Sequence, residues 1–128
     1  MSRDPLERFG AVPLFTLTSD DVADDRPLAR AQWGAGGGGG DVSPQLSWSG
    51  FPAETKSFAV TIHDPDAPTG SGFWHWAVYN IPASVTSLAA GAGAEGGAAL
   101  PQGAAMLSNE LRSKSFTGAG PPPGTGTH

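Results

Sequence analysis

Residues 57–63 read Ser-Phe-Ala-Val-Thr-Ile-His, and this stretch decides the fold class of the chain. In an extended backbone, Phe58, Val60 and Ile62 fall on one face, while the small and polar residues between them fall on the other. The pattern stops at Asp64-Pro65, where proline cannot donate to a β-ladder. The segment therefore predicts a β-strand that ends in a polar turn.

A second long strand is predicted over 73–81, Phe-Trp-His-Trp-Ala-Val-Tyr-Asn-Ile. A period of two places His75 on one face with Phe73, Ala77 and Tyr79, and places Trp74, Trp76 and Val78 on the other, so that both faces are expected to be covered. Two shorter alternating segments, 15–18 and 45–48, predict two further strands.

Glycine and proline dominate the segments between these strands. The 19 glycines and 12 prolines make up about a quarter of the 128 residues, which excludes a mostly helical chain. Segments 20–30, 34–40, 89–105 and 116–128 are predicted to be loops, and 89–105 is rich in alanine and glycine. We therefore expect one all-β domain over 14–128, preceded by a flexible lead-in over 1–13.

Charge and cysteine content exclude several classes of function. The net charge is −5 with only 7 Lys and Arg, so the chain lacks the basic patch that nucleic acids require. Without cysteine it forms no disulfide or zinc–thiolate site. No apolar run resembles a signal peptide or a membrane span, which predicts a cytoplasmic protein.

The densest polar cluster follows the first long strand, as Asp64-Pro-Asp-Ala-Pro-Thr-Gly70. Two prolines stiffen this turn, so Asp64 can be held beside the imidazole of His75. His128 supplies a second imidazole if its glycine-rich loop folds over the same end of the sheet. Backbone N–H groups of that loop would complete a small site for an anion.

Other interpretations of the same residues stay open. Asp64 and Asp66 are also common turn residues, His75 could be a core histidine, and His63 a rim residue. A metal site of two histidines and one carboxylate has its ingredients here but no tight ligand spacing. A hydrolase with His75 as general base lacks a Gly-x-Ser-x-Gly motif around any of Ser43, Ser47, Ser49 and Ser71.

Four motifs in order resemble the phosphatidylethanolamine-binding protein family, and above all its bacterial Raf-kinase-inhibitor-like branch, called YbhB/YbcL. They are Gly40-Asp-Val-Ser-Pro-Gln-Leu-Ser-Trp48, Asp64-Pro-Asp-Ala-Pro68, Gly72-Phe-Trp-His-Trp-Ala-Val-Tyr-Asn-Ile-Pro82 and Gly118-Ala-Gly-Pro-Pro-Pro-Gly-Thr-Gly-Thr-His128. The resemblance implies a β-sandwich with a large antiparallel sheet and a shallow anion pocket. It assigns Asp64, Pro68, His75, Gly120 and His128 to that pocket.

The resemblance also implies a function. Family members bind phosphate-bearing ligands such as phospholipid head groups, inhibit kinases or serine proteases, and are not established as catalytic. It implies no cofactor and no catalytic residue, and a homodimer is expected because bacterial relatives are often dimers. An esterase or phosphoesterase using the same pocket, and a non-functional truncated family member, are the alternatives.

The chain also departs from the family pattern. The arginine and tyrosine that follow the motif histidine are absent after His128, as are the next strand and the terminal helix, so a truncated member is expected. Because that strand lies within the main sheet of the family, neighbouring backbone groups should be left unpaired. Asp41 stands where asparagine is usual, and Glu110 where aspartate is usual.

Overall fold

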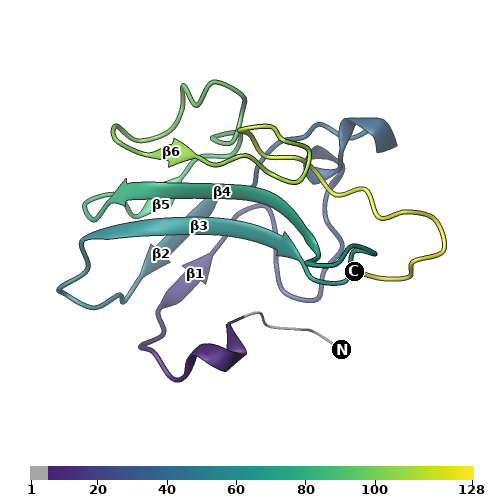
Figure 1. Cartoon of the computed structure of the whole chain (residues 1–128). Coiled ribbons are helices and arrows are strands. Elements are labelled where there is room, and N and C mark those ends of the chain that lie inside the picture. Colours follow the sequence, from purple (N-terminus) through teal and green to yellow (C-terminus); the bar gives the residue numbers. More distant parts are fainter. Residues whose placement is uncertain (1–5) are drawn as a thin grey trace.

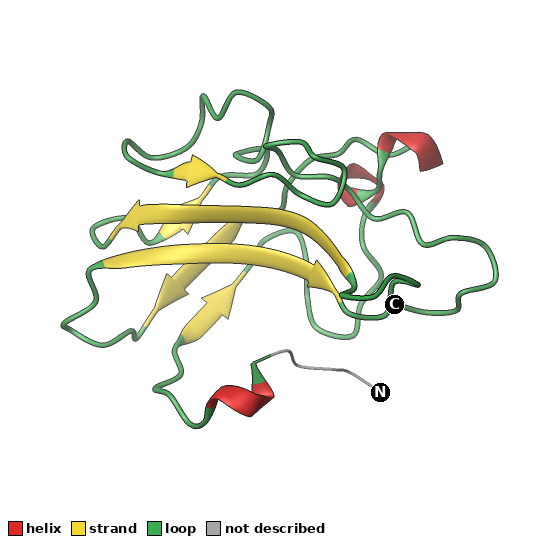
Figure 2. Cartoon of the chain, in the orientation of Figure 1, coloured by secondary structure: helices red, strands yellow, loops and turns green. Residues whose placement is uncertain are grey.

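The computed structural model describes residues 6–128 and shows two small antiparallel sheets (Figures 1 and 2). The first sheet has the order β1-β2-β5, formed by Thr16–Thr18, Leu46–Ser49 and Ser87–Leu88. The second has the order β3-β4-β6, formed by Ser57–Asp64, Phe73–Pro82 and Ala105–Met106. Three short 3-10 turns, η1 (Glu7–Phe9), η2 (Arg30–Gln32) and η3 (Ala35–Gly37), are the only helical elements among these residues. The all-β prediction is confirmed.

The four predicted strands are present, with ends that differ by a residue or two. Phe15 and Gln45 lie outside β1 and β2, whereas Ser49, expected in a turn, is the last residue of β2. The two-residue strands β5 and β6 were not predicted, because so short a segment shows no periodicity. The expected large sheet is divided here into two sheets of three strands.

The core lies between the two sheets. From the first sheet, Leu46, Trp48 and Leu88 point into it; from the second, Phe58, Trp76, Val78 and Ile81 do so. Trp76 and Ile81 are fully buried. Because both sheets bury one face against this cluster, the arrangement is that of a small sandwich.

Two bulges break the period-two pattern predicted for β4. Phe58 pairs with Ile81 and Val60 with Val78, so Tyr79 and Asn80 together lie opposite Ala59. Asn80 adopts a left-handed φ of 58° there, and the extra residue brings Ile81 into the core. The expectation that both faces of β4 are covered is wrong at this point, because Tyr79 is 46% exposed.

The second bulge lies at the other end of β4. Ile62 pairs with Trp76, and His63 pairs with Trp74, so His75 is the residue of β4 without a partner in β3. Trp76 is buried, whereas Trp74 is half-buried and stacks on His63 with ring centroids 4.0 Å apart. Bulges often re-aim a side chain next to a binding site. Here the bulge sets the direction of the imidazole of His75.

The alanine- and glycine-rich excursion over 89–105 packs against the core. Ala92 is fully buried. A Cβ on Gly93 would lie 2.7 Å from Cβ of Phe116 and 3.0 Å from the indole of Trp76. Glycine is therefore required at 93 by close packing, which composition alone does not reveal.

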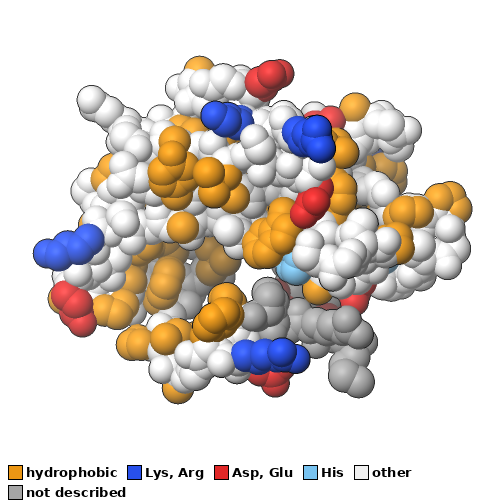
Figure 3. Space-filling model, in the orientation of Figure 1, with side chains coloured by type: hydrophobic (Ala, Val, Ile, Leu, Met, Phe, Trp, Pro, Cys, Tyr) orange, Lys and Arg blue, Asp and Glu red, His pale blue; other side chains and the backbone are white. Residues whose placement is uncertain are grey.

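The outer edge of β3 has no strand partner among the residues that the structure describes. The expectation that a missing strand leaves backbone groups in the sheet unpaired stays a prediction. The segment before β1 keeps its apolar side chains exposed, with Val12 66% and Leu14 89% accessible, and apolar side chains gather on this face of the molecule (Figure 3).

The domain boundaries stay predictions. Residues 1–5 lie outside the described part of the chain. The remainder of the predicted lead-in contains η1 and exposed residues.

Candidate functional site

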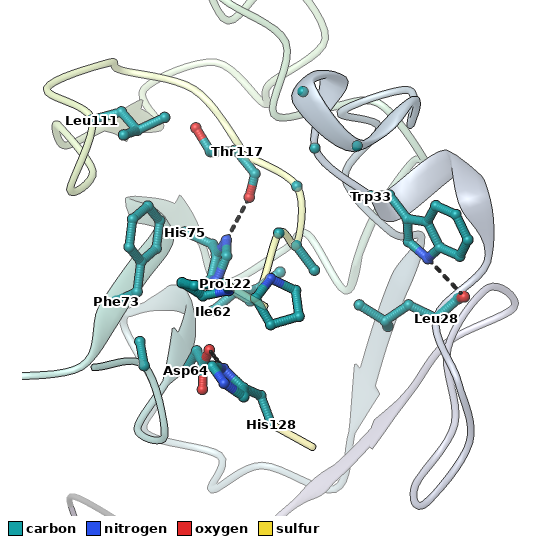
Figure 4. Close-up of a pocket in the computed structure, with 18 of the residues that line it drawn as sticks. Leu28, Trp33, Ile62, Asp64, Phe73, His75, Leu111, Thr117, Pro122 and His128 are labelled. Carbon is teal, nitrogen blue, oxygen red and sulfur yellow. Dashed lines mark hydrogen bonds and ion pairs between the residues drawn. The ribbon is translucent and has the colours of Figure 1, made fainter. Parts of the chain in front are cut away.

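A cleft of about 1190 Å³ opens at the end of the second sheet where β3 stops and β4 begins. Figure 4 shows His75 near its centre, with Asp64 and His128 on one side and Trp33 and Leu28 across the opening. All five predicted site residues line it: Asp64, Pro68, His75, Gly120 and His128. Segments far apart in the sequence thus meet at one cleft.

His75 is fixed through one ring nitrogen. Its Nδ1 lies 2.7 Å from the carbonyl oxygen of Thr117, and the N–H of Thr117 donates back to the carbonyl of His75 at 3.0 Å. A carbonyl can only accept, so Nδ1 carries the proton. Nε2 bonds to none of the described residues and is the nitrogen left to bind a ligand. The ring of Phe73 packs beside it, with centroids 4.6 Å apart.

Asp64 and His128 form an ion pair at the cleft. Nδ1 of His128 lies 2.6 Å from Oδ2 of Asp64. The side chain of His128 is 9% exposed and that of Asp64 is 19% exposed. Nε2 of His128 lies 2.8 Å from the hydroxyl of Thr125, which itself donates to the carbonyl of Pro122. Nδ1 of His128 therefore donates to the carboxylate of Asp64, and Nε2 shares a hydrogen bond with the hydroxyl of Thr125.

The pKa of Asp64 reflects opposing effects. Partial burial of the carboxyl group raises its pKa. The hydrogen bond from His128, the backbone N–H of Asp66 at 2.9 Å and the charges of His128 and His75 together lower the pKa by more. The pKa of Asp64 therefore lies below its ordinary value of 3.8. Asp64 is therefore a carboxylate at neutral pH.

The wall opposite His75 depends on close backbone packing. Trp33 and Ala119 form a parallel bridge, with the N–H of Gly34 donating to the carbonyl of Ala119 at 2.8 Å. A Cβ on Gly118 would lie 2.3 Å from the carbonyl carbon of Trp33. Gly120 differs, because a Cβ there would contact nothing within 4 Å, and its N–H bonds to no described residue. It is therefore available as the backbone donor that the resemblance assigns.

The sequence analysis missed three residues that build the site. Thr117 accepts a hydrogen bond from His75, and Asp41 accepts one from the backbone N–H of Gly118. Asn109 donates to the hydroxyl of Thr117. Asn109 is 7% exposed; its amide nitrogen donates to Ser115 and Thr117, and its oxygen accepts from the backbone of Leu111 and Ser113. The only sequence signal for Asp41 was its position in the family motif over 40–48.

The alternative interpretations fare differently. His63 is a rim residue whose Nε2 lies 2.9 Å from the carbonyl of Ser71, tying the turn after β3. Within residues 6–128 no group of three or more side chains is arranged to hold a metal ion. No serine is among the described residues that line the cleft, and Ser43, one of the four considered, is buried with its hydroxyl accepting from Gly93.

Comparisons with known proteins identify the family of the chain. The family model described as phosphatidylethanolamine-binding protein matches residues 18–128. The chain belongs to this phosphatidylethanolamine-binding protein family. Within the family it falls in the YbcL/YbhB branch: it is 49% identical to Escherichia coli UPF0098 protein YbcL over 116 residues, and 44% identical to UPF0098 protein YbhB over 110 residues.

The fold match covers the same region. The crystal structure of E. coli YbcL matches with a TM-score of 0.83 at 50% identity, over 86% of this chain and 68% of that one. A phosphatidylethanolamine-binding protein homologue from Chlamydia trachomatis matches with a TM-score of 0.68 at 30% identity, over 85% and 67%. In sequence, the chain spans 63% of YbcL and 69% of YbhB, in matches that cover 89% and 84% of the chain itself.

In the part of this family member that the structure describes, no helix combines the length and apolarity that a bilayer crossing needs.

Proposed function

We propose that this chain binds small phosphate-bearing ligands of the phospholipid head-group type in the cleft. The observation that carries the proposal is the state of His75, whose Nδ1 is held by Thr117 while Nε2 is free in the cleft. When protonated, Nε2 can donate a charge-assisted hydrogen bond to a phosphate oxygen.

The charges around the cleft support a ligand bound by few contacts. No lysine or arginine is among the described residues that line it, so its cations are histidines. The carboxylate of Asp64 is already paired with His128, which limits its repulsion of an anion. The free N–H of Gly120 adds a neutral donor. Binding should therefore weaken as pH rises and imidazoles lose their proton.

Inhibition of a kinase or protease is a finer expectation that comes only from the resemblance. The loops 65–72 and 121–127 border the cleft and would be the surfaces that dock such a partner.

A phosphoesterase acting through His75 would need a nucleophile, and the hydroxyls that line the cleft are those of Thr69, Thr117 and Thr127. The homodimer and the cytoplasmic location stay predictions.

Calorimetric titration with phosphorylethanolamine tests the proposal. We expect saturable binding at pH 6, weaker binding at pH 8, and at least about a tenfold loss in His75→Gln, which removes a charge-assisted bond. Tyr79→Phe, on the exposed part of the same strand, is the matched control and should bind like the original chain. Absence of binding at pH 6, or equal binding by His75→Gln, would overturn the proposal.

A further inference from the structure

Asp41 and His75 are joined through a single peptide group. The carbonyl oxygen of Thr117 accepts the Nδ1 proton of His75 at 2.7 Å, and the N–H of the same peptide, that of Gly118, donates to Oδ1 of Asp41 at 2.7 Å. The carboxylate is therefore linked to the imidazole through one amide. Hydrogen bonds in such a chain polarise one another, so that the carboxylate makes the carbonyl a stronger acceptor.

Asp41 uses both of its carboxylate oxygens in this arrangement. While Oδ1 binds Gly118, Oδ2 accepts the N–H of Ala35 at 3.1 Å, and the backbone N–H of Asp41 donates to the carbonyl of Trp33 at 2.9 Å. Asp41 adopts a left-handed φ of 51°, which directs its side chain back over the loop. An asparagine has one acceptor oxygen and would turn its NH₂ group toward the other N–H.

We infer that Asp41 is a positioning residue for His75. By holding the Thr117–Gly118 peptide it keeps the proton of neutral His75 on Nδ1 and directs the lone pair of Nε2 into the cleft. When Nε2 is protonated, the same chain of hydrogen bonds stabilises the imidazolium. The inference rests on the proposed function only in that a correctly oriented His75 would serve ligand binding. The protonation of the His75 ring nitrogens is measured without any ligand.

Other charged groups lie near the imidazole of His75, and the test has to separate their effects from that of Asp41. Asp64, at the end of β3, acts on His75 through its charge, and His128 is paired with Asp64. Glu110 lies on the 109–117 loop; its backbone bonds to Trp74 and its side chain is exposed. Among the charged side chains of residues 6–128, Asp41 alone is connected to Nδ1 through a peptide.

The experiment is nitrogen-15 NMR of the histidine rings in the full chain, without ligand, at a pH where the imidazoles are neutral. His75→Gln identifies the His75 signals among the three histidines. We expect the Nδ1–H form to predominate, and the ratio of Nδ1–H to Nε2–H to fall about tenfold in Asp41→Asn and in Asp41→Ala. Asp21→Asn is the matched control, because Asp21 also accepts a backbone N–H, from Gln45 at 2.7 Å, but does not line the cleft.

The outcomes are decisive in each case. A change in both Asp41 variants but not in Asp21→Asn supports the inference; ring signals that stay the same in folded Asp41 variants overturn it. If these variants do not fold, the Gly118 amide proton of the unaltered chain decides. It should shift both when His75 is protonated and when Asp41 is protonated, and an amide proton that follows neither step overturns the inference. These NMR measurements use no phosphorylethanolamine. Failure of the proposed function is detected separately, by the calorimetric titration.

Discussion

Replacing Gly118 by alanine should destabilise the fold far more than the same change at Gly120, two residues away. A Cβ at 118 would lie 2.3 Å from the carbonyl carbon of Trp33, 2.4 Å from its oxygen and 2.5 Å from the nitrogen of Gly34. All three are backbone atoms, so no side chain can rotate away to relieve the overlap. The wall of the cleft has to move as a unit.

The magnitude follows from the contacts that this movement breaks. Overpacking of this kind costs about 1–3 kcal/mol. Two cross-wall hydrogen bonds, from Gly34 to Ala119 at 2.8 Å and from Ala119 to Gln32 at 3.0 Å, would be stretched or lost, at about 1 kcal/mol each. We therefore expect a loss of roughly 3–5 kcal/mol for Gly118→Ala, and a change within about 0.5 kcal/mol for Gly120→Ala, which is open to solvent.

Urea unfolding followed by tryptophan fluorescence measures the difference, since Trp76 is buried in the core and Trp33 lies at the wall. The midpoint of Gly118→Ala should fall well below that of the original chain, while Gly120→Ala stays close to it. Equal midpoints for the two variants would show that the wall is not packed as described, and would remove the support that it gives to His75.

Three further predictions concern individual residues. Asn109→Ala should cost about 2 kcal/mol, because it leaves several partly buried loop groups without partners; urea unfolding measures this, and a loss below about 0.5 kcal/mol would contradict the role given to Asn109. Ile81→Ala should cost about 3 kcal/mol, since its side chain is fully buried; an unchanged midpoint would argue against the bulge that brings Ile81 inward. Asp64 has a lowered pKa, so its ionised form stabilises the fold above its ordinary value of 3.8, and this stabilisation is lost as the pH falls through the lowered pKa. Melting temperatures of the original chain and Asp64→Asn should therefore differ at pH 6 and converge toward pH 2, and a gap that is constant over that range would refute the linkage.

The sequence predicted the parts of the fold that follow a simple period. The residues of β3 alternate from Ser57 to His63, and β4 was predicted from its aromatic residues. The same reasoning could not place the bulges at His75 and Asn80, because an extra residue in one strand is determined by what the partner strand and the core require. It also missed β5 and β6, which form only through pairing with longer strands.

The site was predicted through motifs more than through physics. Asp64, Pro68, His75, Gly120 and His128 all line the cleft, and their role in binding stays a prediction. Thr117 binds His75 through its backbone carbonyl, which any residue possesses, so that contact leaves no signal in the sequence. Asp41 lies 77 positions from Gly118, and that contact depends on the close packing of Trp33 against glycine, which only the folded chain reveals.

The outer edge of β3, which pairs with no strand within residues 6–128, has a practical consequence for handling the protein. From Ser57 to His63 this edge carries no lysine, arginine, aspartate, glutamate or proline, the residues by which exposed strands normally resist sticking to one another. Purified samples should therefore have a concentration ceiling that is set by strand-to-strand association and is little affected by salt. A single lysine at the exposed position of Thr61 should raise that ceiling.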